Sequence, residues 1–286
     1  MRIRARTSKQ RANYNRPRIK RMNMIPFVES VKIIERQYRT GEEPVLVMCS
    51  DRKNYVCKYM RMSSASYKLS CELIGATMAM AWNLPTPQVA FVNIKHEHWS
   101  GINLSHCLSA PAFGSQFIER VGDVTPSTYG EIPSSVSLLR QLMQIALFDF
   151  WIANEDRNAN NANLIYDVDQ GRLVAIDFGC ILNTATFDYP LSQLTSTDTI
   201  LWSDLFKQVV SGIERGQVNT ILSALKNEYP AYLDNSRQQI CCILEEMPKE
   251  WRVPSDLVKK KLAQLFDSDW TVGVWNNFVE CLKENV

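Results

Sequence analysis

The feature that most constrains this chain is an apolar segment, residues 134–153, that ends abruptly in a polar loop. Its sequence, SSVSLLRQLMQIALFDFWIA, predicts a long apolar helix, and the serines at its start are suited to capping one. It is too short to cross a bilayer, which takes about 18 apolar residues, and Gln144 and Asp149 interrupt it. We therefore expect a helix buried in a globular core, with the loop NEDRNANNANLI (154–165) leaving that core where the helix ends.

The rest of the chain fits a globular protein without a membrane span. At 286 residues it is long enough for one large domain or two lobes, and 45% of its residues are hydrophobic and 22% charged. The start of the chain lacks the apolar core of a signal peptide. The eight cysteines are scattered through core-like segments without a CxxC motif, which favours reduced thiols and a cytoplasmic protein.

Charge is distributed unevenly along the chain. Residues 1–22 hold nine Lys or Arg and no acidic residue, which leaves 23 basic against 30 acidic side chains in the rest of the protein. We expect residues 1–27 to form a basic flexible arm. A solvated tail is its simplest interpretation, and a weak, salt-dependent contact with a polyanion through residues 1–22 is the alternative. The arm has little aromatic content, with Tyr14 alone, and no recognisable DNA-binding motif.

Residues 28–118 predict a small lobe of strands with one helix. Strand-like runs are VKII (31–34), PVLVMC (44–49), NYVCKYM (54–60), VAFVNI (89–94) and SQFIE (115–119). Residues 64–82 form the helical interruption, with an apolar stripe that includes Leu69, Leu73 and Ala76 and with two prolines beyond its end.

Residues 119–286 predict a larger, mostly helical lobe. The long apolar helix is followed by the polar loop and by a hairpin, NLIYDVDQGRLVAID (163–177). Further helices are expected at about 203–213, 217–228, 233–246, 254–266 and 272–283. The fold class is therefore α+β, with a small antiparallel-sheet lobe that carries one helix and a larger helical lobe. The space between two such lobes is a favoured place for a ligand.

Three oxygen-bearing side chains lie at the ends of elements of the large lobe. Asp156 and Asn161 are five residues apart in the polar loop, and Asp177 ends an apolar strand in AIDFG, sixteen residues further on. Carboxylate and amide oxygens suit Mg²⁺, a hard ion that proteins usually share with substrate phosphates. The alternative is that these residues only form turns and caps.

Two charged residues in the small lobe need partners. Strand alternation places Lys58 on one face with the apolar Val56 and Met60, and Glu72 borders the apolar stripe of the helix. Burial of either charge is costly unless it is paired, so we expect the two to meet. A lysine whose ammonium reaches solvent and an ordinary helix-face glutamate are the alternatives.

These five residues, in this order, match the arrangement used for phosphoryl transfer from a nucleotide. DRNANN has the D-x4-N spacing of a kinase catalytic loop, IDFG resembles the metal-binding strand end, and FGSQFIE (113–119) resembles the connector that holds adenine. The chain thus resembles the protein-kinase-like fold and, within it, the HipA-like kinases. The motifs that carry the resemblance fall within about residues 28–200.

The resemblance implies a kinase that uses ATP and Mg²⁺, with a protein serine or threonine hydroxyl as acceptor. Asp156 would be the catalytic residue that orients the hydroxyl, and Lys58, set by Glu72, would hold phosphates. Asn161 and Asp177 would bind the metal. The residues implied at the nucleotide are Lys58, Val56, Gln116, Phe117 and Ile118. HipA-like kinases can pair with small DNA-binding antitoxins, so a regulator of that type is an implied partner beside the protein substrate.

The sequence also departs from this pattern. A glycine-rich phosphate loop is missing, and RTGEEP (39–44) has Gly41 as its single glycine, with two acids beside it. Because this loop has a single glycine, an alternative is a nucleotide-binding pseudokinase that acts as a scaffold. The loop and IDFGCIL are also similar to the DRHxxN and DFG pair of phosphoinositide kinases, but Asn158 replaces the histidine, which counts against a lipid kinase. A lipid or small-molecule acceptor remains an alternative.

Three further residues lie in or beside these motifs, and the sequence suggests a role for each. Arg157 could contact a phosphate, or pair with an acidic residue and so brace the loop. Asn163 is expected to tie the loop together rather than to bind metal. Phe178 is expected to pack in the core.

Overall fold

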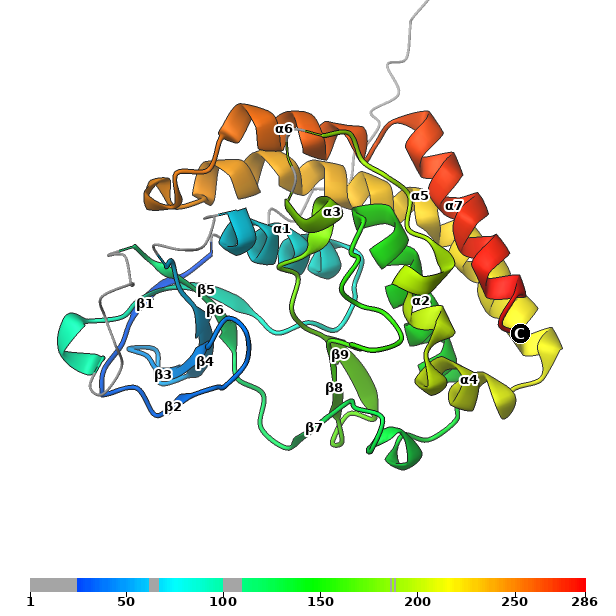
Figure 1. The fold of residues 1–286 in the computed structure, drawn as a ribbon, viewed down its shortest axis with the longest axis horizontal. Coiled ribbons are helices and arrows are strands. Elements are labelled where there is room, and N and C mark those ends of the chain that lie inside the picture. The colour runs from blue at the N-terminus through cyan, green and yellow to red at the C-terminus, as the bar shows by residue number, and fades with distance from the viewer. Residues whose placement is uncertain (1–24, 62–66, 100–109, 186, 188) are drawn as a thin grey trace, which may run out of the picture.

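The computed structural model describes residues 25–61, 67–99, 110–185, 187 and 189–286. Residues 1–24 of the predicted basic arm therefore lie outside the described residues. Figure 1 shows a sheet at one side of the molecule and a group of helices at the other, with α1 (Tyr67–Ala81) between them. This is the α+β, two-lobed arrangement that the sequence predicts.

The small lobe is built on a six-stranded sheet with the order β1-β5-β6-β4-β3-β2. Its strands are β1 (Phe27–Glu29), β2 (Arg36–Gln37), β3 (Val45–Met48), β4 (Asn54–Lys58), β5 (Val89–Asn93) and β6 (Ala112–Gln116). Neighbouring strands are antiparallel except β1 and β5, which run parallel. The predictions for β3, β4 and β5 are confirmed, and the predicted strand at 115–119 lies earlier, as β6.

The expected strand at 31–34 is wrong. The chain forms β1 before this segment, and residues 31–35 are irregular. Val31 and Ile33 are about half exposed, at 49% and 54%, so no core layer selects an extended, alternating conformation there. Single backbone bonds, such as that from the Val31 N–H to the Met48 carbonyl at 3.0 Å, hold the segment at the sheet.

Helix α1 packs against both the sheet and the helices of the large lobe. Its residues from Leu69 to Ala79 are all buried, because the helix has neighbours on every side. Just after its end, the Trp82 ring stacks on Tyr232, with 4.9 Å between centroids, and its indole N–H donates to Ser236 Oγ at 3.0 Å. The element that carries Glu72 is thereby fixed to the large lobe.

The large lobe contains a three-stranded sheet, β7-β8-β9, and six further helices in the described residues. The elements are β7 (Val121–Asp123), α2 (Val136–Ile152), β8 (Leu164–Asp167), β9 (Arg172–Ala175), α3 (Ile181–Ala185), α4 (Asp204–Ser211), α5 (Arg215–Glu246), α6 (Ser255–Gln264) and α7 (Ser268–Lys283). Short 3₁₀ turns occur at His96–His98, Tyr129–Glu131, Ser196–Asp198, Ile200–Trp202 and Lys249–Trp251.

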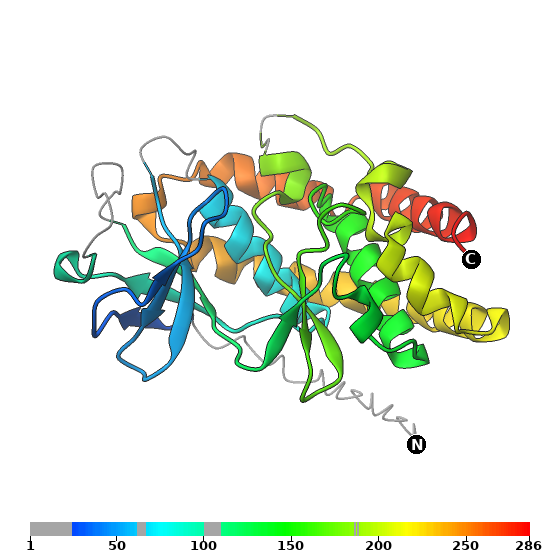
Figure 2. The same cartoon turned by 60° about the horizontal axis from the view of Figure 1, so that its bottom comes forward.

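The central helix of this lobe is α2, as the sequence predicts. Ser135 caps it, since its hydroxyl accepts from the Leu138 N–H at 3.2 Å. The buried hydrophobic residues of α2 belong to one core cluster with those of α1, α5 and α7, and the second face of the small sheet has a separate, smaller cluster. Figure 2 shows α2 alongside α5 and α7. The site at the end of α2 therefore rests on a rigid support.

One prediction about the later helices is wrong. The two helices expected at 217–228 and 233–246 are a single helix, α5, which continues through Pro230. A proline inside a helix removes one backbone hydrogen bond and usually ends or kinks the helix. Here Tyr229 and Tyr232 flank the proline and both pack against the Trp82 ring, so tertiary packing favours continuity.

Among the described residues, no helix is both long and apolar enough to cross a membrane. The seven described cysteines are free thiols. The division of the chain at residues 118 and 119 stays a prediction.

Candidate active site

The centre of the site is a lysine on the sheet and a glutamate on α1. Lys58 ends β4, on the same, less buried face as Val56. Its side chain is 13% exposed, and Nζ donates to Oε1 of Glu72 at 2.5 Å. Glu72 is buried at 2% exposure, as its position beside the apolar stripe of α1 requires. The structure thus brings together the two charges that the sequence predicts to be partners.

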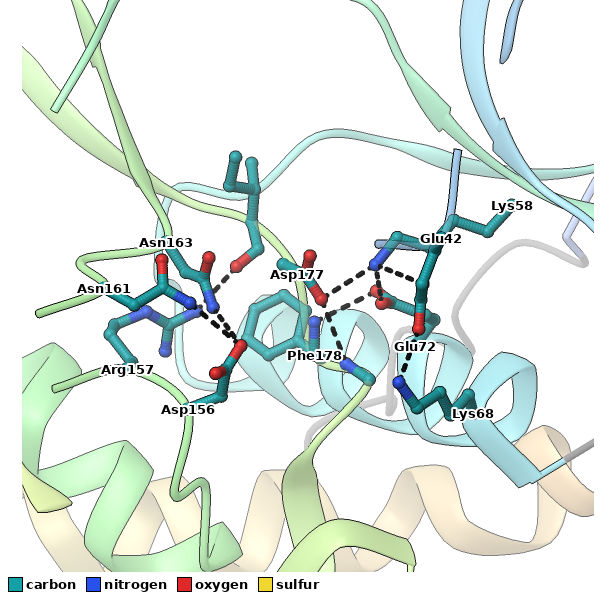
Figure 3. Close-up of polar contacts among 12 residues, drawn as sticks. Glu42, Lys58, Lys68, Glu72, Asp156, Arg157, Asn161, Asn163, Asp177 and Phe178 are labelled. Carbon is teal, nitrogen blue, oxygen red and sulfur yellow. Dashed lines mark hydrogen bonds and ion pairs between the residues drawn. The ribbon is translucent and has the colours of Figure 1, made fainter. Parts of the chain in front are cut away.

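The same lysine also reaches the end of the hairpin in the large lobe. Lys58 Nζ lies 2.7 Å from Oδ1 of Asp177, and the Phe178 N–H donates to the second oxygen of Glu72 at 3.0 Å. Figure 3 shows these contacts converging from β4, α1 and the segment after β9. Asp177 has φ = 58°, a left-handed conformation that costs a non-glycine residue energy and that needs support from its surroundings.

The charges of this cluster perturb one another. Burial alone would lower the pKa of Lys58, but the carboxylates of Glu72, Asp177 and Glu42 outweigh it and raise that pKa above its usual value. Burial raises the pKa of Glu72, although the Lys58 ammonium opposes this. Burial would also raise the pKa of Asp177, but the Lys58 ammonium dominates and lowers it. Lysine and aspartate are therefore both charged at neutral pH.

The polar loop holds the second group of predicted residues. Ala153 ends α2 in a left-handed conformation, with φ = 53°, which turns the chain out of the core. Oδ2 of Asp156 then accepts hydrogen bonds from Nδ2 of Asn161 at 3.1 Å and from Nδ2 of Asn163 at 2.8 Å. In Figure 3, Asp177 lies between this group and Lys58. The expectation that Asn163 ties the loop together agrees with its contact.

Other asparagines of the loop serve the backbone. The Asn158 N–H donates to the Asn161 carbonyl at 2.9 Å, and its side chain bonds the Glu155 carbonyl and the Asn160 N–H, both at 3.0 Å. Asn154 Oδ1 accepts from the Asp156 N–H at 3.4 Å. Short carboxamides satisfy backbone groups that no helix or strand pairs, which explains the run of asparagines.

Arg157 braces the loop from inside. Its side chain is fully buried, and Nη1 donates to Oδ1 of Asp149 on α2 at 2.5 Å. Nη2 donates to the Ile176 carbonyl at 2.9 Å, and the guanidinium lies 5.1 Å from the centre of the Phe178 ring. Of the two alternatives that the sequence leaves open, the structure shows the internal pair. Phe178 is buried, as expected.

This brace holds a costly charge inside the protein. Burial raises the pKa of Asp149 to about 6, against the opposing effects of Arg157 and Asn154. Among the described residues, Asp149 Oδ2 and Arg157 Nε have no hydrogen-bond partner. A buried pair of this kind contributes little net stability, but loss of one partner strands the other charge.

The predicted connector follows β6. The Gln116 N–H donates to the Gln88 carbonyl and the Phe117 N–H to the Asn54 carbonyl, both at 2.8 Å. These two N–H groups are used within the small lobe, so among the three connector residues predicted at the nucleotide a backbone donor to a purine would have to come from Ile118. The nucleotide-binding roles of Val56, Gln116, Phe117 and Ile118 remain predictions.

The structure adds residues that the sequence interpretation did not assign. Glu42, in the segment between β2 and β3, lies 3.1 Å from Lys58 Nζ through Oε2, and 2.9 Å from Lys68 Nζ through Oε1. The two acids in RTGEEP gave a signal for the first of these contacts, but nothing in the sequence singles out Lys68.

A further residue, Glu155, ties the loop to the segment after DFG. It accepts from Nδ2 of Asn183 at 2.8 Å and from the Thr184 hydroxyl at 2.9 Å. Leu182, Asn183 and Thr184 all have positive φ, so α3 contains a left-handed turn. In the sequence, Glu155 stands between Asn154 and Asp156, and no pattern distinguishes it from the other polar residues of the loop.

Known structures offer distant likenesses. Two crystal structures of the Golgi casein kinase, one with Mn/ADP bound, are similar to this chain with TM-scores of 0.46 and identities of 12% and 13%. The likeness covers 92% of this chain and 74% of each of those. A structure of the open conformation of CtTel1 has a TM-score of 0.29 and 11% identity, over 85% of this chain and 11% of that one. No curated protein matches the sequence significantly.

Sequence comparison with protein families gives a firmer result. The match to the HipA-like kinase family spans residues 30–269. It covers the sheet lobe from β2 onward, α1, the polar loop, the hairpin and most of the later helices. The chain belongs to the HipA-like kinase family.

Proposed function

We propose that this protein is an ATP- and Mg²⁺-dependent kinase that phosphorylates a serine or threonine hydroxyl of a protein. The observation that carries the proposal is the position of Lys58 Nζ, which lies 2.5 Å from Glu72 on α1 and 2.7 Å from Asp177 after β9. Three segments distant in sequence thus meet at one ammonium group. A cation fixed in this way is suited to stabilise the charge of a phosphoryl group during transfer.

Asp177 and Asn161 have side-chain oxygens of the kind that a magnesium ion prefers. The Lys58 and Gly179 contacts of Asp177 both use Oδ1 and leave Oδ2 out. Asn161 donates through Nδ2 to Asp156, a contact that does not use its amide oxygen. We propose that Asp177 and Asn161 hold the metal, since Mg²⁺ prefers such oxygens and keeps part of its coordination for water and phosphate. When bound, the ion would neutralise phosphate charge.

We propose that Asp156 orients the acceptor hydroxyl. Two amide groups, from Asn161 and Asn163, fix its Oδ2, and neither contact uses Oδ1. In the proposed step, the acceptor hydroxyl oxygen forms a bond to the γ-phosphorus while the bond between that phosphorus and the ADP oxygen breaks. The hydroxyl proton passes to the Asp156 carboxylate. Catalysis then rests on positioning and electrostatics rather than on a covalent intermediate.

The acceptor class rests on family membership. A protein hydroxyl is the acceptor that the HipA-like resemblance implies, and a small DNA-binding regulator is the implied partner. Labelling a lysate with the purified protein and γ-labelled ATP, followed by identification of the labelled species, tests the acceptor class. Label in lipid or in a small molecule instead of protein would reject it.

The decisive experiment for the function measures transfer of labelled phosphate from ATP to the protein itself and to a lysate. We expect wild type to transfer label in the presence of Mg²⁺ and Asp177→Ala to be deficient. Asp169→Ala is the matched control, because Asp169 lies in the exposed turn between β8 and β9 and pairs with Arg120. Equal labelling by wild type and Asp177→Ala would remove Asp177 from the mechanism.

A second candidate is a nucleotide-binding pseudokinase that serves as a scaffold. The observation in its favour is Glu42, whose carboxylate contacts Lys58 in the place of a glycine-rich loop. This candidate requires a thermal shift with ATP and Mg²⁺ without any transfer or hydrolysis. Measurable transfer that depends on Asp156 would exclude it.

The basic arm supplies a separate, weaker proposal, a polyanion contact through residues 1–22. Its positive charges would bind phosphates in a salt-dependent way. Deletion of residues 1–22 should reduce retention on heparin. Unchanged retention would dismiss the contact without affecting the kinase assignment.

A further inference from the structure

The segment between β2 and β3 places one carboxylate between two lysines of the candidate site. Glu42 Oε2 lies 3.1 Å from Lys58 Nζ, and Glu42 Oε1 lies 2.9 Å from Lys68 Nζ. Lys68 belongs to the first turn of α1, so the two ammonium groups come from the sheet and from the helix. Figure 3 shows the side chain of Glu42 between them. A single anionic group thus bridges both cations.

Acidic side chains outnumber basic ones around this bridge. The acidic residues are Glu42, Glu72 and Asp177, and the basic residues are Lys58 and Lys68. The carboxylates are close together, because a Cβ placed on Gly179 would lie 3.1 Å from Glu72 Oε1, 3.5 Å from Asp177 Oδ1 and 3.8 Å from Glu42 Oε1. A triphosphate that entered this site would bring further negative charge close to these acidic side chains.

Of the three carboxylates, Glu42 is the one placed to leave. Glu72 is buried on a helix, and Asp177, although its side chain is 39% exposed, directly follows a core strand. Glu42 lies instead on a connecting segment, with its side chain 30% exposed. That segment is closed by two backbone bonds, Tyr38 N–H to the Pro44 carbonyl and Glu43 N–H to the Thr40 carbonyl. A Cβ on Gly41 would meet nothing within 4 Å, so there is open space beside the turn at this residue.

We propose that Glu42 stands in for a phosphate group in the nucleotide-free protein, and that Lys58 and Lys68 together bind nucleotide phosphates once Glu42 has moved aside. Lys68 then supplies contacts that a glycine-rich loop would otherwise give, and this chain lacks such a loop. The bridge by Glu42 keeps both ammonium groups in position and competes with the triphosphate. This inference rests on the proposed nucleotide-binding function and adds to it a binding residue and a competing carboxylate.

The test compares binding of a non-hydrolysable ATP analogue, with Mg²⁺, and of adenosine, by titration calorimetry. Glu42→Gln keeps the shape of the side chain and removes its charge, and Lys68→Gln removes the second cation. Glu43→Gln is the control for the first variant, because the Glu43 carboxylate contacts Arg61 instead. Lys32→Gln is the control for the second, since Lys32 pairs with Glu35 at the surface.

We expect Glu42→Gln to bind the analogue at least about tenfold more tightly than wild type, which corresponds to about 1.4 kcal/mol. Lys68→Gln should bind it several-fold more weakly, and both controls should match wild type. Adenosine affinity should change in none of the variants, because the proposed contacts involve phosphates alone. Binding of the analogue by Glu42→Gln but not by wild type would also support the competition.

The failures of the two proposals are distinguishable. Wild-type binding of the analogue with Glu42→Gln and Lys68→Gln equal to their controls would overturn the inference and leave the kinase assignment intact. A parallel change in adenosine affinity would also overturn it, since the effect would then be one of pocket shape. Absence of analogue binding in wild type and all variants would overturn both proposals.

Discussion

Two clusters of charged side chains contact Phe178, and they differ in whether a charged ligand can reach them. The lysine cluster consists of Lys58, Glu72 and Asp177, and Asp177 leaves 39% of its side chain exposed. The buried brace consists of Asp149 and Arg157, at 1% and 0% exposure. The cluster has more acidic than basic side chains and an accessible edge at Asp177, whereas the brace is a closed pair. The difference indicates that the cluster can take up a charged ligand and that the brace supports the loop that surrounds it.

Replacement of the pair in the lysine cluster gives the largest expected effect on activity. In Lys58→Met/Glu72→Gln the buried charge of Glu72 is removed together with its cation, and Asp177, which loses its contact with Lys58, has a side chain that is 39% exposed, so the protein should fold. Transfer should fall by about 100-fold or more because the fixed cation is lost. Transfer of γ-phosphate and the urea midpoint are measured on the same sample. Retained transfer would show that the cluster is structural, as the brace is.

Breaking the brace should affect stability most. Arg157→Ala leaves the Asp149 carboxylate buried without its cation, and we expect a loss of about 3–5 kcal/mol in the free energy of unfolding. Arg120→Ala is the control, because Arg120 is 75% exposed and pairs with Asp169 at the surface. Urea denaturation without nucleotide measures both, and equal losses would contradict the role of the brace.

A change in the packing of α1 against Phe178 should have a smaller effect on stability. A Cβ on Gly75 of α1 would lie 2.3 Å from Cβ of Phe178, so Gly75→Ala should lower the free energy of unfolding by about 1–3 kcal/mol through overpacking. A Cβ on Gly216 of α5 would meet nothing within 4 Å, and Gly216→Ala should be neutral or slightly stabilising. Thermal unfolding of the two variants separates these outcomes, and a stabilised Gly75→Ala would refute the close contact.

The smallest effect concerns pH. The pKa of Asp177 is lowered because, although burial would raise it, the Lys58 ammonium dominates, so its favourable contribution is present at neutral pH and is lost as pH falls through the lowered value. Between about pH 5 and pH 2, wild type should therefore lose more free energy of unfolding than Asp177→Asn. Urea titrations at several pH values give both slopes. Parallel slopes would show that Asp177 is not held in its charged form.

The sequence predicted those parts of the site in which a charge conflicts with its surroundings. Lys58 and Glu72 sit among apolar residues, and each needs a partner, so their meeting could be inferred without coordinates. The helix-to-loop change at Ala153 was visible in the same way, because hydrophobicity ends there abruptly. Local patterns carry this information, since burial of unpaired charge is expensive wherever it occurs.

The rest depended on tertiary packing. Residues 31–34 have strand propensity but lie at the margin of the sheet, with two of them half exposed, and α5 continues through Pro230 because aromatic neighbours support both of its halves. Lys68 gave no signal because an exposed lysine in a first helical turn is common, and its meaning depends on Glu42 from another segment. Propensity decides such positions only when packing does not.

The most direct test of the central claim separates nucleotide binding from transfer in Asp156→Asn. In the proposed mechanism, the lysine cluster binds the triphosphate and Asp156 acts on the acceptor alone. Asp156→Asn should therefore bind the Mg²⁺ complex of the ATP analogue as wild type does, and lose about 100-fold or more in transfer. Transfer at the wild-type rate, or loss of binding together with transfer while Asp169→Asn retains both, would contradict the account.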